Sequence, residues 1–297
     1  MGETANVVAS YGDVGSLDTH SVSIDWGDGT SSVGTAAGGT ASGSHTYASG
    51  GIYTVTLTLS DDDSSSDTAT TTAYVSGVGV SAGQLQIIGT SGDDLVTVNL
   101  ANGDQVIRIH ASFLPPNPGY IDVPLAAVSS ILLVLLGGND QATLAGNMTL
   151  PAVLDGGSGD DRLNAGGGGA VLLGGTGNDF LQGNTGNDIL IGGLDADVLI
   201  GGPDEDILIG GTTIYDGNDS ALLSLLAEWT SSRTFAERVT NTHSGAGPIL
   251  TGQKFDETTV SNDGAVDRLN GASGSDWFFL LFDEDEVNLV KSDEQVN

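Results

Sequence analysis

The strongest constraint on this chain is a nine-residue repeat that runs without a register slip through residues 156–209. Its units are GGSGDDRLN, AGGGGAVLL, GGTGNDFLQ, GNTGNDILI, GGLDADVLI and GGPDEDILI. Glycine dominates positions 1, 2 and 4, where it can supply the positive φ of a tight turn. Position 8 is leucine in every unit: Leu163, Leu172, Leu181, Leu190, Leu199 and Leu208. A period this short fits one turn and one short strand. Two units therefore predict a flattened coil whose strands stack in parallel on the next coil.

The sixth position of the repeat predicts two rows of carboxylates, one on each edge of the coil. The first row is Asp161, Asp179 and Asp197, and the second is Asp188 and Asp206, with Ala170 as a gap. Carboxylates at strand spacing repel by roughly 3–4 kcal/mol per pair at an effective dielectric near 20. Each buried leucine contributes only roughly 2 kcal/mol. A dication between successive turns would reverse the repulsion, and Ca²⁺ suits such carboxylate and carbonyl ligands better than Mg²⁺ does.

The pattern GGxGxDxUx resembles the RTX, or hemolysin-type, calcium-binding repeat, whose β-roll binds Ca²⁺ in its turns. The resemblance implies about three to five calcium ions. The metal-binding residues that we expect are Asp161, Asp179, Asp197, Asp188, Asp206, Gly157, Gly159, Gly175, Gly177, Gly186, Asp195 and Asp204.

The repeat departs from this pattern at a few positions, which are Ala165, Ala170, Asn184, Asp195 and Asp204. We expect a weak site or none at Ala170. The last two replace the fourth glycine and either add charge to a site or strain its turn. We also expect Asp179→Ala to be more harmful than Asp206→Ala, because Asp206 ends its row.

The acidic composition favours a cation as partner. A net charge of −32 makes nucleic acid and anionic membrane surfaces poor partners. The acids recur at set positions in a chain that is 38% hydrophobic, which argues against disorder.

The chain has no cysteine, so neither a disulfide nor a thiolate metal site can form. Bound metal is an alternative way to stabilise the fold. The longest apolar run, ILLVLL at 131–136, is too short to span a bilayer.

Residues 1–76 predict a separate β-sandwich, because apolar residues alternate through SVSIDW at 21–26 and IYTVTLTLS at 52–60. DWGDGT, HTY and GIYTVTLTLSD in this region resemble the PKD domain, an Ig-like sandwich that commonly serves as a spacer or adhesive module outside cells. The opening strand is expected to be short or absent.

Four residues of these PKD-like motifs have expected roles. We expect Trp26 and Tyr53 to lie in the core and Asp25 and Asp28 to organise a turn.

The remaining segments complete a mostly all-β fold class: an Ig-like β-sandwich followed by a right-handed parallel β-solenoid, or β-roll, with a small helical C-terminal cap. Residues 77–155 are interpreted as an irregular lead-in, 156–211 as the β-roll and 212–297 as the cap. The cap should hold helices at 219–230 and 233–241 and a degenerate repeat at 269–280.

Three polar residues precede the first predicted helix. Asp216, Asn218 and Asp219 are expected to cap it, with calcium binding at the end of the roll as the alternative.

No enzyme motif is visible. HExxH, GxSxG and GxxxxGK[ST] are missing, and the histidines are scattered: His20, His45, His110 and His243. A glycosidase-like pair of carboxylates stays open, since acids are plentiful. We therefore expect a calcium-binding structural or adhesion module, bacterial and secreted or at the cell surface, and a piece of a longer protein.

Two alternatives to this role stay open. One is a self-assembling adhesin or matrix component. The other is an accessory carbohydrate-binding region of a larger secreted enzyme. The expected partners are calcium, other copies of the chain, and extracellular protein or glycan, with neither nucleic acid nor a membrane span.

Overall fold

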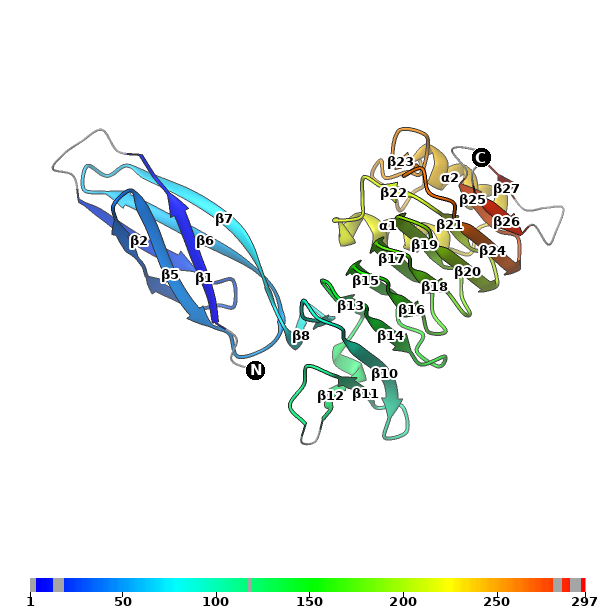
Figure 1. Ribbon diagram of the computed structural model, residues 1–297, viewed down its shortest axis with the longest axis horizontal. Helices are drawn as coiled ribbons and strands as arrows, with labels where there is room; N and C mark the ends of the chain where they lie inside the picture. Colours follow the sequence, from blue (N-terminus) through cyan, green and yellow to red (C-terminus); the bar gives the residue numbers. More distant parts are fainter. Residues whose placement is uncertain (1–3, 13–18, 117–118, 280–284, 289–294, 297) are drawn as a thin grey trace. The chain divides into compact units, whose positions relative to one another are not determined.

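The computed structural model describes residues 4–12, 19–116, 119–279, 285–288 and 295–296 (Figure 1). The chain divides into two compact units, residues 1–79 with 86–88 and residues 80–85 with 89–297. The neighbouring strands β8 (Gly77–Ser81) and β9 (Gln84–Ile88) mark where the chain passes from one unit to the other. Leu280 of the predicted degenerate repeat and residues 13–18 of the predicted sandwich fall outside the described residues.

The N-terminal unit is a β-sandwich of antiparallel strands, as predicted. Its strands are β1 (Thr4–Ser10), β2 (His20–Asp25), β3 (Ser31–Val33), β4 (Thr35–Ala37), β5 (Thr40–Thr46), β6 (Gly51–Asp61) and β7 (Ser66–Val75). They form one sheet in the order β1-β5-β4 and a second in the order β3-β2-β6-β7. Side chains of both sheets share a core that includes Ile24, Trp26, Ala41 and Leu57, each no more than 3% exposed.

The expectation of a missing opening strand is wrong. Strand β1 has seven residues and pairs with β5 along its whole length, from Thr4 opposite Thr46 to Ser10 opposite Thr40. Its alternation is weak in sequence because its inward residues include alanines, Ala5 and Ala9, which pack against the core beside Val7.

The predicted turn role of Asp25 and Asp28 is confirmed. Oδ1 of Asp25 accepts a hydrogen bond from the Gly27 amide at 2.9 Å, and Oδ1 of Asp28 accepts one from the Thr30 amide at 2.9 Å. Oδ2 of Asp28 lies 2.8 Å from Nε2 of His45. Both carboxylates are thus engaged by their own turn, and Asp28 also contacts His45 of β5. Of the two predicted core residues, Trp26 is buried and Tyr53 is only partly buried against the same core.

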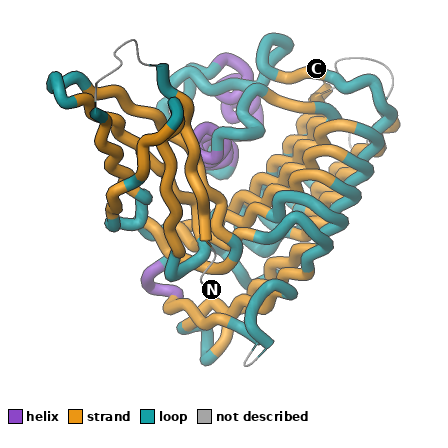
Figure 2. The backbone as a smooth tube through the Cα atoms, turned by 60° about the vertical axis from the view of Figure 1, so that its left-hand side comes forward, coloured by secondary structure: helices purple, strands orange, loops and turns teal. Residues whose placement is uncertain are grey.

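The second unit is a parallel β-solenoid built from two stacked sheets (Figures 1 and 2). Sheet I contains β10 (Leu95–Ala101), β11 (Val106–Ala111), β12 (Ile121–Pro124), β14 (Gln141–Leu144), β16 (Arg162–Asn164), β18 (Phe180–Gln182), β20 (Val198–Pro203), β24 (Arg268–Ser273) and β26 (Glu286–Asn288). Besides β8 and β9, sheet II contains β13 (Ser130–Val134), β15 (Ala152–Ser158), β17 (Ala170–Thr176), β19 (Ile189–Leu194), β21 (Ile207–Ile209), β25 (Trp277–Phe279) and β27 (Gln295–Val296). A short 3₁₀ helix, η1 (Leu125–Ala127), precedes β13.

The chain alternates between the two sheets, so each strand lies beside the strand two units away. Leu163 pairs with Leu181 and Leu181 with Leu199 in sheet I, while Leu172 pairs with Leu190 in sheet II. The six leucines of position 8 are completely buried between the sheets. The predicted coil of two repeat units is therefore confirmed.

The outer faces of the two sheets differ. In sheet II the residues on either side of the central leucine are also apolar and buried, as in Ile189 and Ile191. In sheet I the equivalent positions, Phe180 and Gln182, are only partly buried. The difference arises because helix α1 (Asp219–Trp229) packs on β15 and β17 of sheet II. The sequence shows this asymmetry in most units: AVLL and DILI belong to sheet II, whereas DRLN and DFLQ belong to sheet I, where DVLI is the exception.

The two helices of the expected cap lie in an insertion, and the predicted degenerate repeat that follows them continues the solenoid. After α2 (Phe235–Ser244), strands β24 and β25 resume sheets I and II in register with β20 and β21. The insertion is closed at its base by β22 (Thr212–Thr213) and β23 (Val260–Ser261), which pair antiparallel. Hydrophobic burial explains this placement, because α1 covers the apolar outer face of sheet II with Leu222, Leu225 and Leu226.

The predicted helix cap is confirmed for Asn218 but not for Asp216 and Asp219. Asn218 is the N-cap of α1, because its side chain accepts from the Ala221 amide at 3.1 Å, and Asp219 is the first helical residue. Asp216 instead accepts hydrogen bonds from the amide and the hydroxyl of Thr213 and so closes the preceding turn.

Candidate metal centre

The position-6 aspartates form two ladders, one along each edge of the solenoid. In ladder A the Asp161 amide donates to Oδ1 of Asp179, and the Asp179 amide donates to Oδ1 of Asp197, both at 2.7 Å. In ladder B the Asp188 amide donates to Oδ1 of Asp206 at 2.9 Å. Each aspartate thus links its own coil to the preceding one, across 18 residues of chain.

The second oxygen of each carboxylate has no protein partner. Oδ2 is buried and makes no hydrogen bond in Asp140, Asp161, Asp179, Asp188, Asp197 and Asp206. A buried ionised carboxylate without compensation is strongly unfavourable. A row of such oxygens is the strongest physical indication of a cation in this molecule.

Backbone carbonyls converge on the same points as these oxygens. The Cβ of a residue replacing Gly174 would lie closer than 3.0 Å to both Oδ2 of Asp179 and the carbonyl of Gly192 on the next coil. The same pairing of a carboxylate and a carbonyl occurs at Gly156, Gly183 and Gly192. A carboxylate oxygen and a backbone carbonyl from the next coil are both ligand types that Ca²⁺ accepts.

The acidic side chains do not form compact clusters. Among the described residues, no three acidic or imidazole side chains gather around one point. Backbone carbonyls would therefore supply most ligands of each ion. The donor set fits a hard cation, and it does not fit a soft metal that needs thiolate or imidazole.

The glycines of the repeat serve two different purposes. Outside the unit that contains Ala170, those at positions 2 and 4 adopt positive φ, as predicted, for example Gly157 at 96°, Gly159 at 121°, Gly175 at 111°, Gly177 at 114° and Gly186 at 107°. The glycines at position 1 do not, and they are required because a Cβ would occupy the space in front of the carboxylate.

The unit without a carboxylate supports this reading of position 1. Ala170 replaces the aspartate, and in the same unit Ala165 replaces the first glycine. Where the carboxylate is missing, a Cβ therefore fits at position 1. The Ala170 amide still donates to Oδ1 of Asp188 at 2.7 Å, so ladder B keeps its backbone link but lacks one charge there.

Asp195 and Asp204 replace the fourth glycine and keep its backbone conformation. Their φ angles are 76° and 84°, in the left-handed region that is unfavourable for residues other than glycine. Oδ2 of Asp204 accepts from the Gly186 amide at 3.1 Å, and the Asp195 amide donates to Oδ2 of Asp263 at 2.7 Å. Both residues therefore occupy strained turn positions and add charge beside the ladders.

The ladder aspartates are held in an environment that disfavours their charge. Burial, together with repulsion from neighbouring carboxylates, raises the pKa of Asp161 and Asp179 to about 7. For the same reasons the pKa of Asp206 rises to about 8 and that of Asp197 to about 9. At neutral pH the ladders need either protons or cations, which compete for the same oxygens.

The ladders extend beyond the aspartates that the repeat identified. The Asp94 amide donates to Oδ1 of Asp140 at 2.6 Å, and the Asp140 amide to Oδ1 of Asp161 at 2.7 Å. At the other end, Asp267 continues ladder A and Asp276 continues ladder B. Asp206 is therefore not the last of its row, which corrects the expectation based on its position.

Weak sequence signals for these additional aspartates exist. GTSGDDLVT at 89–97 and GASGSDWFF at 271–279 both place aspartate at the sixth position of the same nine-residue frame. These two aspartates are not recognised from the nine-residue period, because additional residues separate them from the regular repeat.

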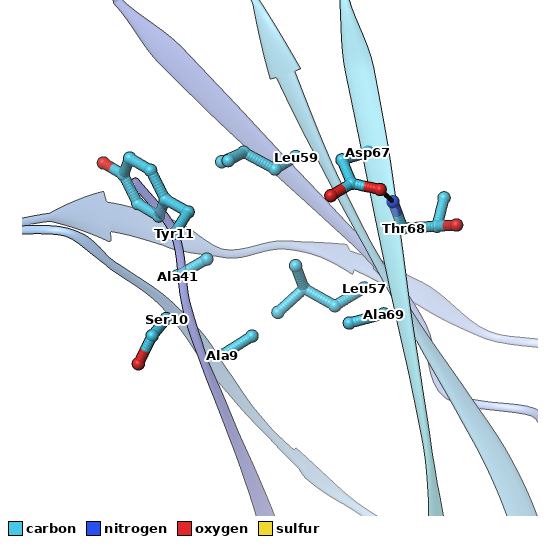
Figure 3. A pocket seen from close by; sticks show the side chains of 9 residues that line it. All are labelled: Ala9, Ser10, Tyr11, Ala41, Leu57, Leu59, Asp67, Thr68 and Ala69. Carbon is cyan, nitrogen blue, oxygen red and sulfur yellow. Dashed lines mark hydrogen bonds between the residues drawn. The ribbon is translucent and has the colours of Figure 1, made fainter. Parts of the chain in front are cut away.

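The N-terminal unit contains a small cavity (Figure 3). It has a volume of about 50 Å³ and is lined largely by apolar side chains, among them Ala41, Leu57 and Leu59. Asp67, at its rim, is hydrogen-bonded to the Thr68 amide at 2.8 Å. A cavity of this size holds a few water molecules and no sugar ring.

Comparison with known families agrees with the two units. Residues 1–76 match the PKD domain, and residues 153–172 and 173–208 match the RTX calcium-binding nonapeptide repeat. No curated protein and no solved structure matches the chain significantly. The described residues contain no helix that is long and apolar enough to cross a membrane.

Proposed function

We propose that this chain is an extracellular structural module whose solenoid folds and stiffens when calcium binds along its two ladders. The observation that carries the proposal is the row of buried Oδ2 atoms without hydrogen bonds. At four of them, those of Asp161, Asp179, Asp188 and Asp197, a carbonyl of a neighbouring coil borders the same space in front of a position-1 glycine. The match of this segment to the RTX calcium-binding repeat supports the same ion.

Different groups of the chain have different roles at each proposed calcium site. Oδ1 of one aspartate holds the amide of the preceding coil and fixes the side chain, which leaves Oδ2 to face the turn. The glycine at position 1 keeps that space open, and the glycines at positions 2 and 4 turn the backbone. Bound calcium would supply the positive charge that cancels repulsion between coils. Without it, the buried carboxylates oppose folding.

Calcium dependence fits a protein that works outside the cell. Extracellular calcium sites function with Kd values of about 10⁻⁴–10⁻³ M, so millimolar calcium outside would suffice. The solenoid would then be loose at low intracellular calcium and rigid after export, because binding adds to the free energy of unfolding. The PKD domain supports a spacer or adhesive role, and both families are typically structural modules.

We retain two alternatives for the biological role. A self-assembling adhesin or matrix component would show calcium-dependent growth in light scattering, whereas a spacer would stay monomeric. An accessory carbohydrate-binding region would bind on a glycan array. The cavity in Figure 3 gives no support to the second alternative, because it is too small for a sugar ring.

The proposal is tested by circular dichroism and calorimetry on the full chain. Metal-stripped protein should show a reduced β signal and a lower Tm than protein in millimolar calcium, and titration should give a stoichiometry of about three to five ions per chain. A spectrum and a Tm that do not respond to calcium would overturn it.

A further inference from the structure

The insertion interrupts the chain but leaves both ladders intact. The Asp197 amide donates to Oδ1 of Asp267 at 2.8 Å, and the Asp206 amide donates to Oδ1 of Asp276 at 2.9 Å. These pairs are 70 residues apart, where every pair within the repeat is 18 apart. Two equivalent junctions between coils are therefore formed by segments on opposite sides of the insertion.

The junction in ladder A has the features of the sites inside the repeat. Oδ2 of Asp197 is buried without a hydrogen bond, and the side chain of Asp197 is only 1% exposed. A Cβ on Gly192 would lie closer than 3.0 Å to this oxygen and to the carbonyl of Gly210. Gly210 in turn has no room for a Cβ because of Oδ2 of Asp267. Gly210 is thus the position-1 glycine of a turn that ends, after the insertion, at Asp267.

The junction in ladder B shares the buried carboxylate and the position-1 glycines of this arrangement. Oδ2 of Asp206 is buried without a hydrogen bond, and the residue is fully buried. Gly201 and Gly271 have no room for a Cβ in front of Oδ2 of Asp206 and of Asp276, respectively. The Trp277 amide donates to the Asp206 carbonyl at 2.8 Å, which fixes the two coils in register.

The helical insertion contacts the turn at ladder B directly. Nε1 of Trp229, at the end of α1, donates to the Glu205 carbonyl at 2.7 Å. Arg238 of α2 forms an ion pair with the Glu205 side chain and donates to the Trp229 carbonyl at 2.7 Å. The rings of Trp229 and Trp277 lie 6.2 Å apart. The residue beside Asp206 is therefore held by both helices.

We propose that calcium also binds at these two junctions, between Asp197 and Asp267 and between Asp206 and Asp276, and so fastens the helical insertion to the solenoid. Asp267 and Asp276 lie outside the residues that match the calcium-binding repeat. Each ion would connect two chain segments that are 70 residues apart. It would thereby restrict the conformations of the insertion between them, as a cross-link that closes a loop does. The proposal rests on the proposed function, because it extends the same ladders.

Terbium luminescence can test the junction in ladder B, since Tb³⁺ is a hard cation that replaces Ca²⁺ and emits when a nearby tryptophan is excited. Trp277 follows Asp276 directly, and Trp229 lies beside it. We expect strong tryptophan-sensitised emission from the full wild-type chain, displaced by excess calcium. Asp276→Asn should weaken Tb³⁺ binding at this site at least about tenfold, and Trp277→Phe should reduce the emission without changing the calcium stoichiometry.

Calorimetry with calcium alone tests both junctions. Asp267→Asn and Asp276→Asn should each lower the stoichiometry by one ion, whereas Asp104→Asn, which makes the same charge change in an exposed turn, should not. If both ladder variants keep the wild-type stoichiometry and emission, this proposal is overturned while the proposed function stands. A wild-type chain that binds no calcium would overturn both. Circular dichroism at saturating calcium confirms that each variant is folded.

Discussion

The Asp161 amide is hydrogen-bonded to Oδ1 of Asp179 at 2.7 Å, while Oδ2 of Asp179 is buried without any hydrogen bond. One carboxylate therefore has two separate tasks. Its first oxygen joins adjacent coils through the backbone, and its second remains available for a cation. Because the hydrogen bond fixes the side chain, the second oxygen faces the turn before any ion arrives, which lowers the cost of ordering a site.

The extended ladders change the expected ranking of aspartate substitutions. Asp179 lies between Asp161 and Asp197, and Asp206 likewise lies between Asp188 and Asp276. Asp179→Ala and Asp206→Ala should therefore lower calcium affinity and stoichiometry to a similar extent, as measured by calorimetry. A much milder effect of Asp206→Ala would show that its row ends there and that Asp276 takes no part.

The metal-free solenoid should become less stable as pH rises. The pKa of Asp161, Asp179, Asp206 and Asp197 is raised from 3.8 to between about 7 and about 9 in the folded chain. The folded state thus binds more protons than the unfolded state between pH 4 and pH 9. Its stabilisation by these groups is complete below about pH 4 and is lost as pH rises through the folded pKa values.

Calorimetric melting of metal-stripped protein from pH 5 to pH 9 measures this effect. The solenoid transition should move to lower temperature with rising pH, and millimolar calcium should restore it at pH 8. Metal is best removed by prior dialysis, because a chelator kept in the sample loses affinity in acid. A metal-free transition that rises with pH would contradict the raised pKa values.

Gly174→Ala should damage the site although Gly174 does not have a positive φ. The new Cβ would lie closer than 3.0 Å to Oδ2 of Asp179 and to the Gly192 carbonyl, so we expect a loss of about 1–3 kcal/mol in the free energy of unfolding and weaker calcium binding. Gly146→Ala is the matched control, since no atom lies within 4 Å of the Cβ position there.

A double-mutant cycle separates crowding of the carboxylate from general strain. In an Asp179→Ala background, Gly174→Ala should cost less by at least about 0.5 kcal/mol, as the natural combination of Ala165 with Ala170 indicates. Equal costs in both backgrounds, measured by denaturant unfolding in calcium, would assign the effect to the backbone alone.

The corrected helix cap has a measurable consequence. Asn218→Ala removes the side-chain acceptor of the Ala221 amide and should destabilise the insertion by about 1 kcal/mol. Asp219→Ala should cost less, because Asn218 and not Asp219 makes the N-cap hydrogen bond. Amide hydrogen exchange in α1 reports both variants, and the reverse order would make Asp219 the cap.

The repeat alone determined the coil, the buried leucines and the division of its aspartates between two edges. Local spacing is sufficient for these features, because a period of nine residues sets which side chains meet after one full coil. The same spacing indicated calcium through the repulsion of stacked carboxylates, and the sandwich followed from alternating strands with the PKD-like motifs.

The tertiary structure decided where each ladder ends and why position 1 is glycine. Asp267 and Asp276 join the ladders because the chain returns in register after the insertion, whose helix α1 covers the apolar face of sheet II. A Cβ at position 1 would clash with Oδ2 of an aspartate and with a carbonyl of another coil, as at Gly174. Spacing along the chain cannot reveal these relationships, because they arise from contacts between segments that are distant in sequence.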